Sequence, residues 1–239
     1  MYFLLSGEGP TDIGTGTTSA AICEGPDYSF GPMAVMVEQT VRKRHNYSIF
    51  DKGCCGHVSK HHLAERAKDL KTVKKALRLP GKKQKKETRY FFNNARVLSR
   101  IAKAKLSELE EEVVAVLFRD SDGTASAGRG PWGDKFQSML DGFDEEGFSR
   151  GVPMIPKPKS EAWLICALKS NPYQGCDALE DRSGSDRSPK SLKKELENLL
   201  GKQPTRELLC DKVRKRAVDI DKIKMPSFKA FRERLEEVI

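Results

Sequence analysis

Short apolar runs alternate with longer amphipathic segments along this chain, which is typical of α/β proteins. Three apolar runs predict buried strands, at residues 2–6, 113–118 and 151–156. A weaker apolar run at residues 47–50 predicts a further strand. We therefore predict an α/β fold with a largely parallel sheet that is flanked by helices.

The apolar spacing between the strands predicts amphipathic helices. We expect helices at residues 32–43, 57–79, 88–109, 134–146 and 227–239, and one that opens with Ser160 as its N-cap. Segments rich in glycine and small polar residues predict loops at residues 14–28, 123–133 and 175–188. We expect one domain over residues 1–239, with residues 45–110 forming a basic helical insertion within it.

The charge of the chain predicts a polyanionic partner. The chain has 239 residues, enough to bury a sizeable core, and a formal net charge of +9 with a pI of about 9.2. Such an excess of positive charge favours nucleic acid as a partner. The predicted nucleic-acid contacts are Lys74, Lys75, Arg78, Lys82, Lys83, Lys85, Lys86 and Arg89. The simpler alternative is that the lysine run at residues 82–86 is a solvated turn and that Phe91 and Phe92 pack in the core.

Apolar length and cysteine usage predict the compartment. No apolar stretch is long enough to span a bilayer, so we expect no membrane partner, and the first residues predict a strand rather than a signal peptide. The six cysteines have no framework spacing, which predicts reduced thiols and a cytoplasmic protein.

The segment C-C-G-H-V-S-K-H-H raises the question of a zinc site. His57 and His61 would share one face if the segment were helical, and Cys54 and Cys55 lie close to them. Adjacent cysteines strain a tetrahedral site, and no second C-x-x-C pair follows. Reduced thiols beside histidines that meet phosphate are the stronger interpretation.

Acidic residues follow the predicted strands. Glu8 and Asp12 follow the first strand, Asp120 and Asp122 follow the second, and Glu161 comes shortly after the third. Because the carboxyl ends of parallel strands share one edge, we expect these side chains to converge, with Asp120 and Asp122 on one side by strand period. Converging carboxylates repel one another unless a cation neutralises them, and Mg²⁺ prefers carboxylates, water and phosphates. The pattern therefore predicts a metal site.

The glycines after the first strand do not form a phosphate-binding loop by themselves. Gly9 and Gly14 have the Walker spacing, but Thr15 stands where that motif needs lysine. Asp12 stands where a dinucleotide-binding motif has its third glycine. We therefore expect the acids to hold metal and the metal to hold phosphate. The simpler alternative is that the acids cap turns and helices, and that Glu161 complements a helix dipole.

These motifs resemble the Toprim domain family, which occurs in topoisomerases, primases and OLD-family nucleases. They are most similar to the Toprim domains of OLD-family nucleases and to small stand-alone Toprim-like proteins of bacteria and phages. The shared segments are E-G-x-T-D at residues 8–12, D-x-D-G at 120–123, P-x-x-E-A-W-L at 158–164 and P-S-F at 226–228.

The resemblance implies a Toprim-like fold and a hydrolase, a metal-dependent nuclease that cleaves phosphodiester bonds in DNA or RNA. It implies Mg²⁺ or Mn²⁺ at a two-metal site, an anti-phage role and an ATPase partner. The catalytic residues that it implies are Glu8, Asp120, Asp122 and a late lysine, Lys222 or Lys224. The metal ligands that it implies are Glu8, Asp12, Asp120, Asp122 and Glu161.

Two other functions agree with the same residues. The first is a non-catalytic nucleic-acid binding or adaptor module in which the acidic cluster is structural or regulatory. The second is a phosphotransferase that acts on a small nucleotide, because the same metal chemistry serves it.

Overall fold

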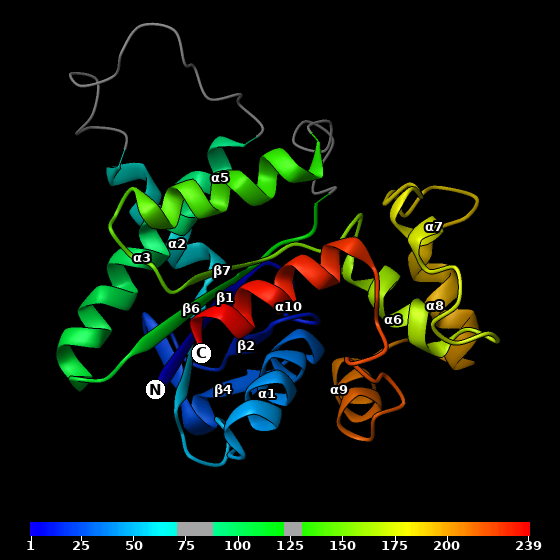
Figure 1. Ribbon diagram of the computed structural model, residues 1–239, viewed down its shortest axis with the longest axis horizontal. Helices are drawn as coiled ribbons and strands as arrows, with labels where there is room; N and C mark the ends of the chain where they lie inside the picture. The colour runs from blue at the N-terminus through cyan, green and yellow to red at the C-terminus, as the bar shows by residue number, and fades with distance from the viewer. Residues whose placement is uncertain (71–87, 122–130) are drawn as a thin grey trace, which may run out of the picture.

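A five-stranded sheet organises the molecule, which is a computed structural model that describes residues 1–70, 88–121 and 131–239 (Figure 1). The strand order is β3-β5-β1-β6-β7, and every neighbouring pair is parallel except β3 with β5. Strands β2 and β4 form a separate antiparallel pair. The strands are β1 (Tyr2–Gly7), β2 (Gly14–Gly16), β3 (Ile22–Glu24), β4 (Tyr28–Phe30), β5 (Cys55–Ser59), β6 (Val113–Phe118) and β7 (Gly151–Met154). The predicted α/β class with a largely parallel sheet is confirmed.

Helices cover both faces of this sheet. They are α1 (Pro32–His45), α2 (Lys60–Asp69), α3 (Arg89–Leu109), α5 (Trp132–Asp144), α6 (Ser160–Leu168), α7 (Asp177–Glu180), α8 (Leu192–Leu200), α9 (Arg206–Arg214) and α10 (Pro226–Val238), with a 3-10 turn at Gly25–Asp27. No helix in the described ranges is long and apolar enough to cross a membrane.

The central strand is apolar on both sides, which explains the two helical layers. Phe3 and Leu5 of β1 belong to a core cluster shared with α1, α6 and α10. Tyr2 and Leu4 point the other way, into a cluster shared with α2, α3 and α5. Strand period places alternate residues on opposite faces, so a strand buried on both sides reads as one apolar run. Figure 1 shows α3 and α5 on one side of the sheet and α1 and α10 on the other.

The order of the strands creates a switch point beside β1. The chain passes from β1 through α1 to β5, and then through α2 and α3 to β6 on the other side of β1. In open α/β sheets, ligands bind outside the carboxyl ends of the strands at such a point. Here those ends are Gly7 of β1 and Phe118 of β6, which are register partners.

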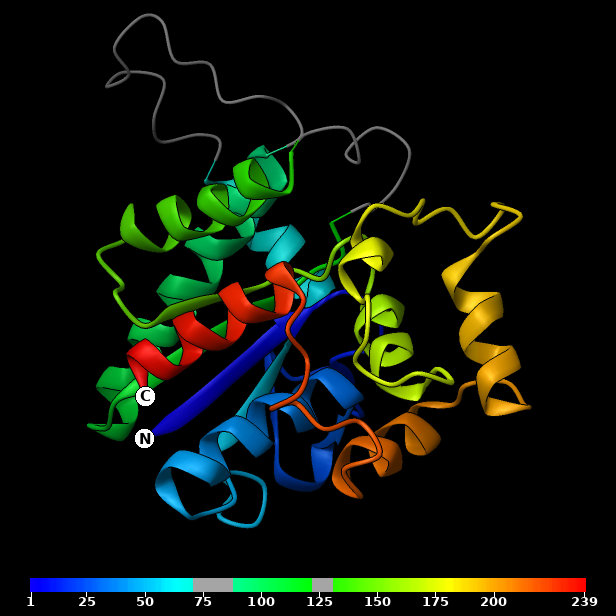
Figure 2. The same ribbon diagram turned by 45° about the vertical axis from the view of Figure 1, so that its right-hand side comes forward.

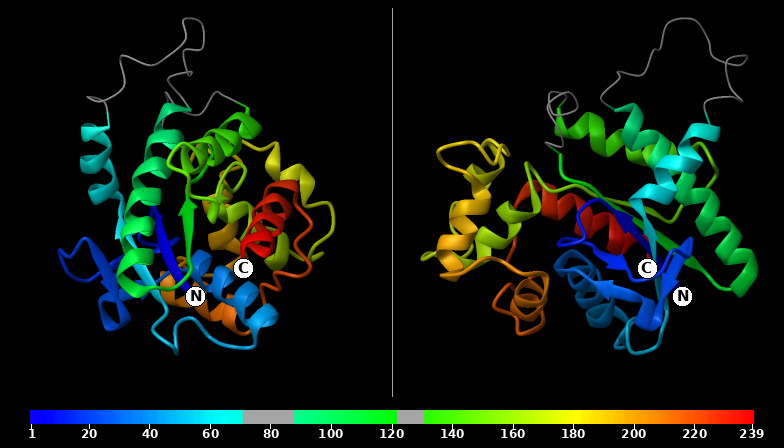
Figure 3. Two further views of the ribbon diagram at one scale, coloured as in Figure 1. Left: turned by 60° about the vertical axis from the view of Figure 1, so that its left-hand side comes forward. Right: turned by 180° about the vertical axis from the view of Figure 1, so that it is seen from behind.

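The helices α6 to α9 stand beside the sheet, and α10 returns across it (Figures 2 and 3). The indole N–H of Trp163 in α6 donates to the Ser227 hydroxyl at 2.8 Å, and its ring packs edge-on against Phe228 with 4.9 Å between the ring centroids. Trp163 and Phe228 both belong to motifs that carry the Toprim resemblance. The two segments therefore meet in the core.

The segment 45–110 differs from its prediction. Residues 47–50 form no strand, and the second core strand is β5, at Cys55–Ser59, where a helix was expected. Strand β5 pairs with β1, so residues 55–59 belong to the central sheet and are not helical. A Cβ atom at Gly56 would collide with the Tyr2 hydroxyl and with Ile22, so the glycine allows the neighbouring strands to approach. Likewise, the expected loop at 14–28 contains β2 and β3.

One cysteine pair differs from its prediction. Cys166 and Cys176 form a disulfide, so the expectation that all six cysteines are reduced is wrong. The other four are free thiols. His57 lies in strand β5 and His61 in helix α2, so they do not share the helix face that a zinc site would need. The disulfide closes the C-terminal end of α6 onto the loop that follows it.

Candidate acidic active site

A tight turn after β1 places the first aspartate. The backbone N–H groups of Asp12 and Ile13 both donate to the Gly9 carbonyl, at 3.0 and 3.2 Å. Gly9 has a φ of 85°, and a Cβ atom there would collide with the Asp12 carboxylate. Only glycine adopts this conformation without strain, so Gly9 is required for the position of Asp12. The Asp12 carbonyl in turn accepts from Met33 N–H at 3.0 Å, which fixes the start of α1.

Ser160 connects the two strand ends. Its hydroxyl donates to Asp12 Oδ1 at 2.5 Å, and its backbone N–H donates to Asp120 Oδ1 at 3.0 Å. Ser160 is the first residue of α6 and Lys159 is the N-cap, so the prediction that Ser160 is the cap is wrong by one position. The side chains of Asp12 and Asp120 occupy the start of the helix instead. Helix starts have free N–H groups and favour negative charge, which explains this arrangement.

The loop after β6 is anchored by the chain before α6. The Ser121 N–H donates to the carbonyls of Pro156 and Pro158, at 3.2 and 3.1 Å, and its hydroxyl also donates to Pro158. The buried ammonium of Lys135 donates to the Ser121 carbonyl. These bonds hold Asp120 at the carboxyl edge of the sheet.

Asp12 and Asp120 carry more negative charge than their surroundings compensate. The pKa of Asp12 is raised, and burial is the largest cause. The Ser160 hydroxyl lowers this pKa, and the nearby charges of Glu161 and Glu8 raise it. Burial raises the pKa of Asp120 well above its ordinary value, and the charges of Asp12, Glu161 and Glu8 add to that increase. Converging carboxylates in a partly buried site favour either a proton or a bound cation.

Glu8 is in a different electrostatic environment. Its Oε2 lies 3.2 Å from the Lys60 ammonium and 3.2 Å from an Arg119 guanidinium nitrogen. The Arg119 guanidinium carbon lies 3.5 Å from the centroid of the Tyr90 ring, which fixes the arginine against the start of α3. Two cations therefore stand at one side of the acidic cluster, on the elements that follow β5 and β6.

A small cavity opens beside the carboxylates. It has a volume of about 190 Å³, and Asp12, Ser160 and Glu161 line one side of it. Its other walls include Lys193, from α8. Glu161 is thus brought to the same place as Asp12, as the sequence predicts for an acid at this edge.

The fit of a divalent cation to these residues is partial. Carboxylate oxygens are the donors that Mg²⁺ and Mn²⁺ prefer, and the raised pKa values of Asp12 and Asp120 are what a cation would relieve. Across residues 1–70, 88–121 and 131–239, however, no three Asp, Glu, His or Cys side chains are grouped closely enough to hold a metal. Asp122, a predicted ligand, lies outside the described residues.

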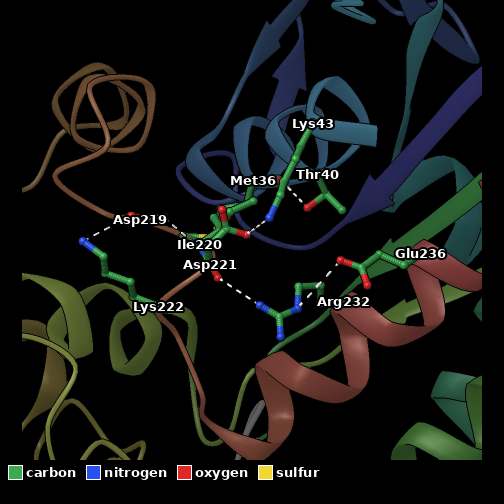
Figure 4. A network of polar contacts seen from close by, with 9 residues as sticks. All are labelled: Met36, Thr40, Lys43, Asp219, Ile220, Asp221, Lys222, Arg232 and Glu236. Carbon is green, nitrogen blue, oxygen red and sulfur yellow. Dashed lines mark hydrogen bonds and ion pairs between the residues drawn. The ribbon is translucent and has the colours of Figure 1, made fainter. Parts of the chain in front are cut away.

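The late lysines have contacts elsewhere. The Lys222 ammonium lies 3.4 Å from Asp219 (Figure 4). It also lies 5.8 Å from the centroid of the Tyr173 ring. Tyr173 follows the C-terminal end of α6, whereas Ser160 is at the N-terminal end. These contacts of Lys222 are therefore at the far end of α6 from the carboxylates. Lys224 is exposed just before α10.

The predicted nucleic-acid contacts fall mostly outside the described residues. Arg89 is exposed at the first position of α3. The contacts that lie outside the described residues are Lys74, Lys75, Arg78, Lys82, Lys83, Lys85 and Lys86. Phe91 and Phe92 are buried, which supports core packing over stacking on a base.

Sequence reasoning missed the groups that contact the acids. The sequence patterns do not single out Lys60 or Arg119, and they predict Ser160 only as a cap. The position of Arg119 directly before Asp120, at a strand end, was the one available signal.

No protein-family model matches the chain, and no curated protein or solved structure matches it significantly.

Proposed function

We propose that this protein is a metal-dependent phosphodiesterase that cleaves DNA or RNA at the carboxyl edge of β1 and β6. The observation that carries the proposal is the convergence of Asp12 and Asp120 on Ser160, without a basic partner for either carboxylate among the described residues. The Toprim resemblance supports the same chemistry, with Mg²⁺ or Mn²⁺ as the cofactor and an anti-phage role beside an ATPase partner as its context.

The residues of the chain would have separate tasks. Asp12, Asp120 and Glu161 offer oxygen donors for a cation, and a bound divalent cation supplies charge that activates water and stabilises a leaving oxygen. Lys60 and Arg119 stand beside these acids and could bind a substrate phosphate, since both already bind the carboxylate of Glu8. Lys60 is the more accessible of the two, because 53% of its side chain is exposed, against 10% for Arg119.

A non-catalytic nucleic-acid binding or adaptor module is the second candidate function. One observation favours it: Ser160 connects Asp12 and Asp120 by hydrogen bonds, and Lys60 and Arg119 pair with Glu8, which are contacts that a structural cluster would also have. Under this proposal the cluster holds β1, β6 and α6 together, and the basic charge of the chain binds nucleic acid without cleavage.

Cleavage of plasmid DNA and of single-stranded RNA in Mn²⁺ or Mg²⁺ distinguishes the two functions. For the enzyme we expect metal-dependent cleavage that is lost in Asp120→Asn, because asparagine keeps the acceptor for Ser160 but removes the charge. Asp144→Asn is the matched control, because Asp144 is exposed at the end of α5. Absence of cleavage by the wild-type chain, with nucleic-acid binding retained, would support the adaptor module.

A further inference from the structure

A second, larger cavity lies between α1 and α9. It has a volume of about 720 Å³, and its walls are the C-terminal half of α1, the end of β4, the segment 46–51 and the end of α9. This volume is within the range of pockets that hold small ligands and cofactors. The cavity shares no lining residue with the small cavity beside the carboxylates, so it is separate from the acidic site. Figures 1 and 3 show α1 and α9 on the same side of the sheet.

Two of the four cations that line this cavity are available to bind an anion. Arg42 is engaged by Glu38 at 2.8 Å and by Asp51 at 3.5 Å. Lys43 is engaged by Asp221 at 2.7 Å, as Figure 4 shows. Arg214 and Arg216 line the cavity and are exposed, and neither has an acidic partner in the described part of the chain. A guanidinium presents a planar set of donors that suits phosphate.

Arg216 has a backbone conformation that favours glycine. Arg216 has a φ of 56° in the turn that ends α9, where its N–H donates to Val213 at 2.9 Å. This position of a helix end favours glycine, because other residues carry strain there. Gln39 of α1 donates to the Val213 carbonyl at 2.6 Å, which fixes this turn against the cavity wall.

Another part of the cavity wall is aromatic. The rings of Phe30 and Phe50 are stacked, with 3.7 Å between their centroids and 13° between their planes. Both side chains line the cavity and are partly exposed. Each ring covers one face of the other, so the ring edges and an outer face are what the pair can offer a ligand. An apolar aromatic surface suits a base, since base–aromatic stacking does not depend on base identity.

We propose that the cavity between α1 and α9 binds a mononucleotide, with its phosphate on Arg214 and Arg216 and its base against Phe30 and Phe50. The arginines and the phenylalanines together indicate a ligand that has both a phosphate and a planar base. The arginines alone would suit any phosphate, and the phenylalanines alone would suit any planar apolar group. The proposal does not depend on the acidic site, which shares none of these residues.

Titration calorimetry with AMP, CMP, adenosine and ribose 5-phosphate tests the proposal. We expect both nucleotides to bind, and adenosine and ribose 5-phosphate, which each lack one half of the ligand, to bind at least about tenfold more weakly. Arg216→Gly should weaken AMP binding by at least about tenfold without lowering the melting temperature, because glycine suits the φ of this position. Phe50→Leu should weaken AMP binding and leave ribose 5-phosphate binding unchanged.

Lys215→Ala is the matched control. It removes the same charge one residue away, and Lys215 does not line the cavity but pairs with Asp211 at 3.3 Å. We expect it to bind AMP as the wild type does. The proposal is overturned if neither nucleotide binds at millimolar concentration. It is also overturned if Arg216→Gly binds AMP as tightly as the wild type, if Lys215→Ala loses as much affinity, or if ribose 5-phosphate binds as tightly as AMP.

Discussion

The Ser160 hydroxyl donates a hydrogen bond to the Asp12 carboxylate at 2.5 Å, although 148 residues separate the two in the sequence. This bond joins the turn after the first strand to the first turn of α6. Through the backbone of the same serine, α6 also holds Asp120. Ser160 is therefore the point at which both strand ends of the candidate site are fixed.

Replacing Ser160 tests its positioning role. In Ser160→Ala, Asp12 loses its hydroxyl donor but Asp120 keeps the backbone N–H. We expect the free energy of unfolding to fall by about 1.5–3 kcal/mol, the range for hydrogen bonds to charged groups. The pKa of Asp12 should rise further, because the Ser160 bond lowers it. Chemical denaturation checks this, with Ser170→Ala, at an exposed position, as the control. Equal stability of the two variants would contradict the role.

Divalent metal should stabilise the folded chain. A cation that binds only the native state stabilises it by mass action, by about 2.7 kcal/mol at a hundred times its dissociation constant. We expect Mg²⁺ or Mn²⁺ to raise the melting temperature of the wild type and to raise it less in Asp12→Asn. An unchanged melting temperature of the wild type at millimolar metal would argue strongly against a metal site.

The direction in which Asp120→Asn changes nucleic-acid binding distinguishes catalytic acids from structural ones. Without metal, an ionised Asp120 repels a substrate phosphate and a protonated Asp120 is neutral, so in either state Asp120→Asn should bind nucleic acid as tightly as the wild type or more tightly. Its cleavage in Mn²⁺ should be lost. Structural acids predict lower melting temperature and weaker binding together. The measurements are a binding titration in chelator, a cleavage assay and a thermal melt on both proteins, and intact cleavage would exclude a catalytic Asp120.

Nucleic-acid binding should weaken steeply with salt. Each phosphate contact contributes about 0.9 to the slope of log affinity against log salt on duplex DNA. Charge reversal at the four lysines of residues 82–86, namely Lys82, Lys83, Lys85 and Lys86, should therefore flatten the slope. Charge reversal of Lys215, on α9, is the control. If the slope is unchanged, this run is a solvated turn.

His57 should make stability depend on pH. Burial lowers its pKa to about 4, and both ring nitrogens lack a hydrogen-bond partner among the described residues. The unfolded chain, with an ordinary histidine pKa near 6.5, binds more protons between these pH values, so stability falls as the pH falls from about 6.5 to 4. The loss is roughly 3 kcal/mol.

The matched variant for this effect is His57→Phe, which keeps a ring to stack on Tyr28. The raised pKa values of Asp12 and Asp120 act in the opposite direction, because those groups bind protons more readily when folded. The quantity to compare is therefore the difference in unfolding free energy between the two proteins across pH. A difference that does not change with pH would contradict the prediction.

The sequence predicts the central strands and the edge at which the acids gather, because β-branched runs such as Val113–Phe118 carry a strong local signal. It does not predict β5. That strand contains Gly56 and His57 in place of an apolar run, and it is a strand because its neighbours approach closely at the glycine. Tertiary packing overrides local propensity there.

The residues of the candidate site are also only partly predictable from the sequence. Glu8, Asp12 and Asp120 can be chosen from their positions after strands, since topology alone brings strand ends together. The contacts of Lys60 and Arg119 with Glu8 depend on side-chain directions that no spacing rule specifies. The disulfide between Cys166 and Cys176 likewise depends on a turn after α6 that brings the two together.

The place of β1 in the sheet affects how the chain folds. This strand is synthesised before the residues that pair with it, because Cys55 and Val114 lie far along the chain. Pairing over such separations is slow, and an apolar strand with unpaired edges is prone to aggregate until its partner strands have paired with it. The bond from Ser160 to Asp12 cannot form until α6 has left the ribosome. A nascent chain that ends before residue 160 thus lacks the serine that fixes its acids, and we expect any activity of this site to appear only late in folding.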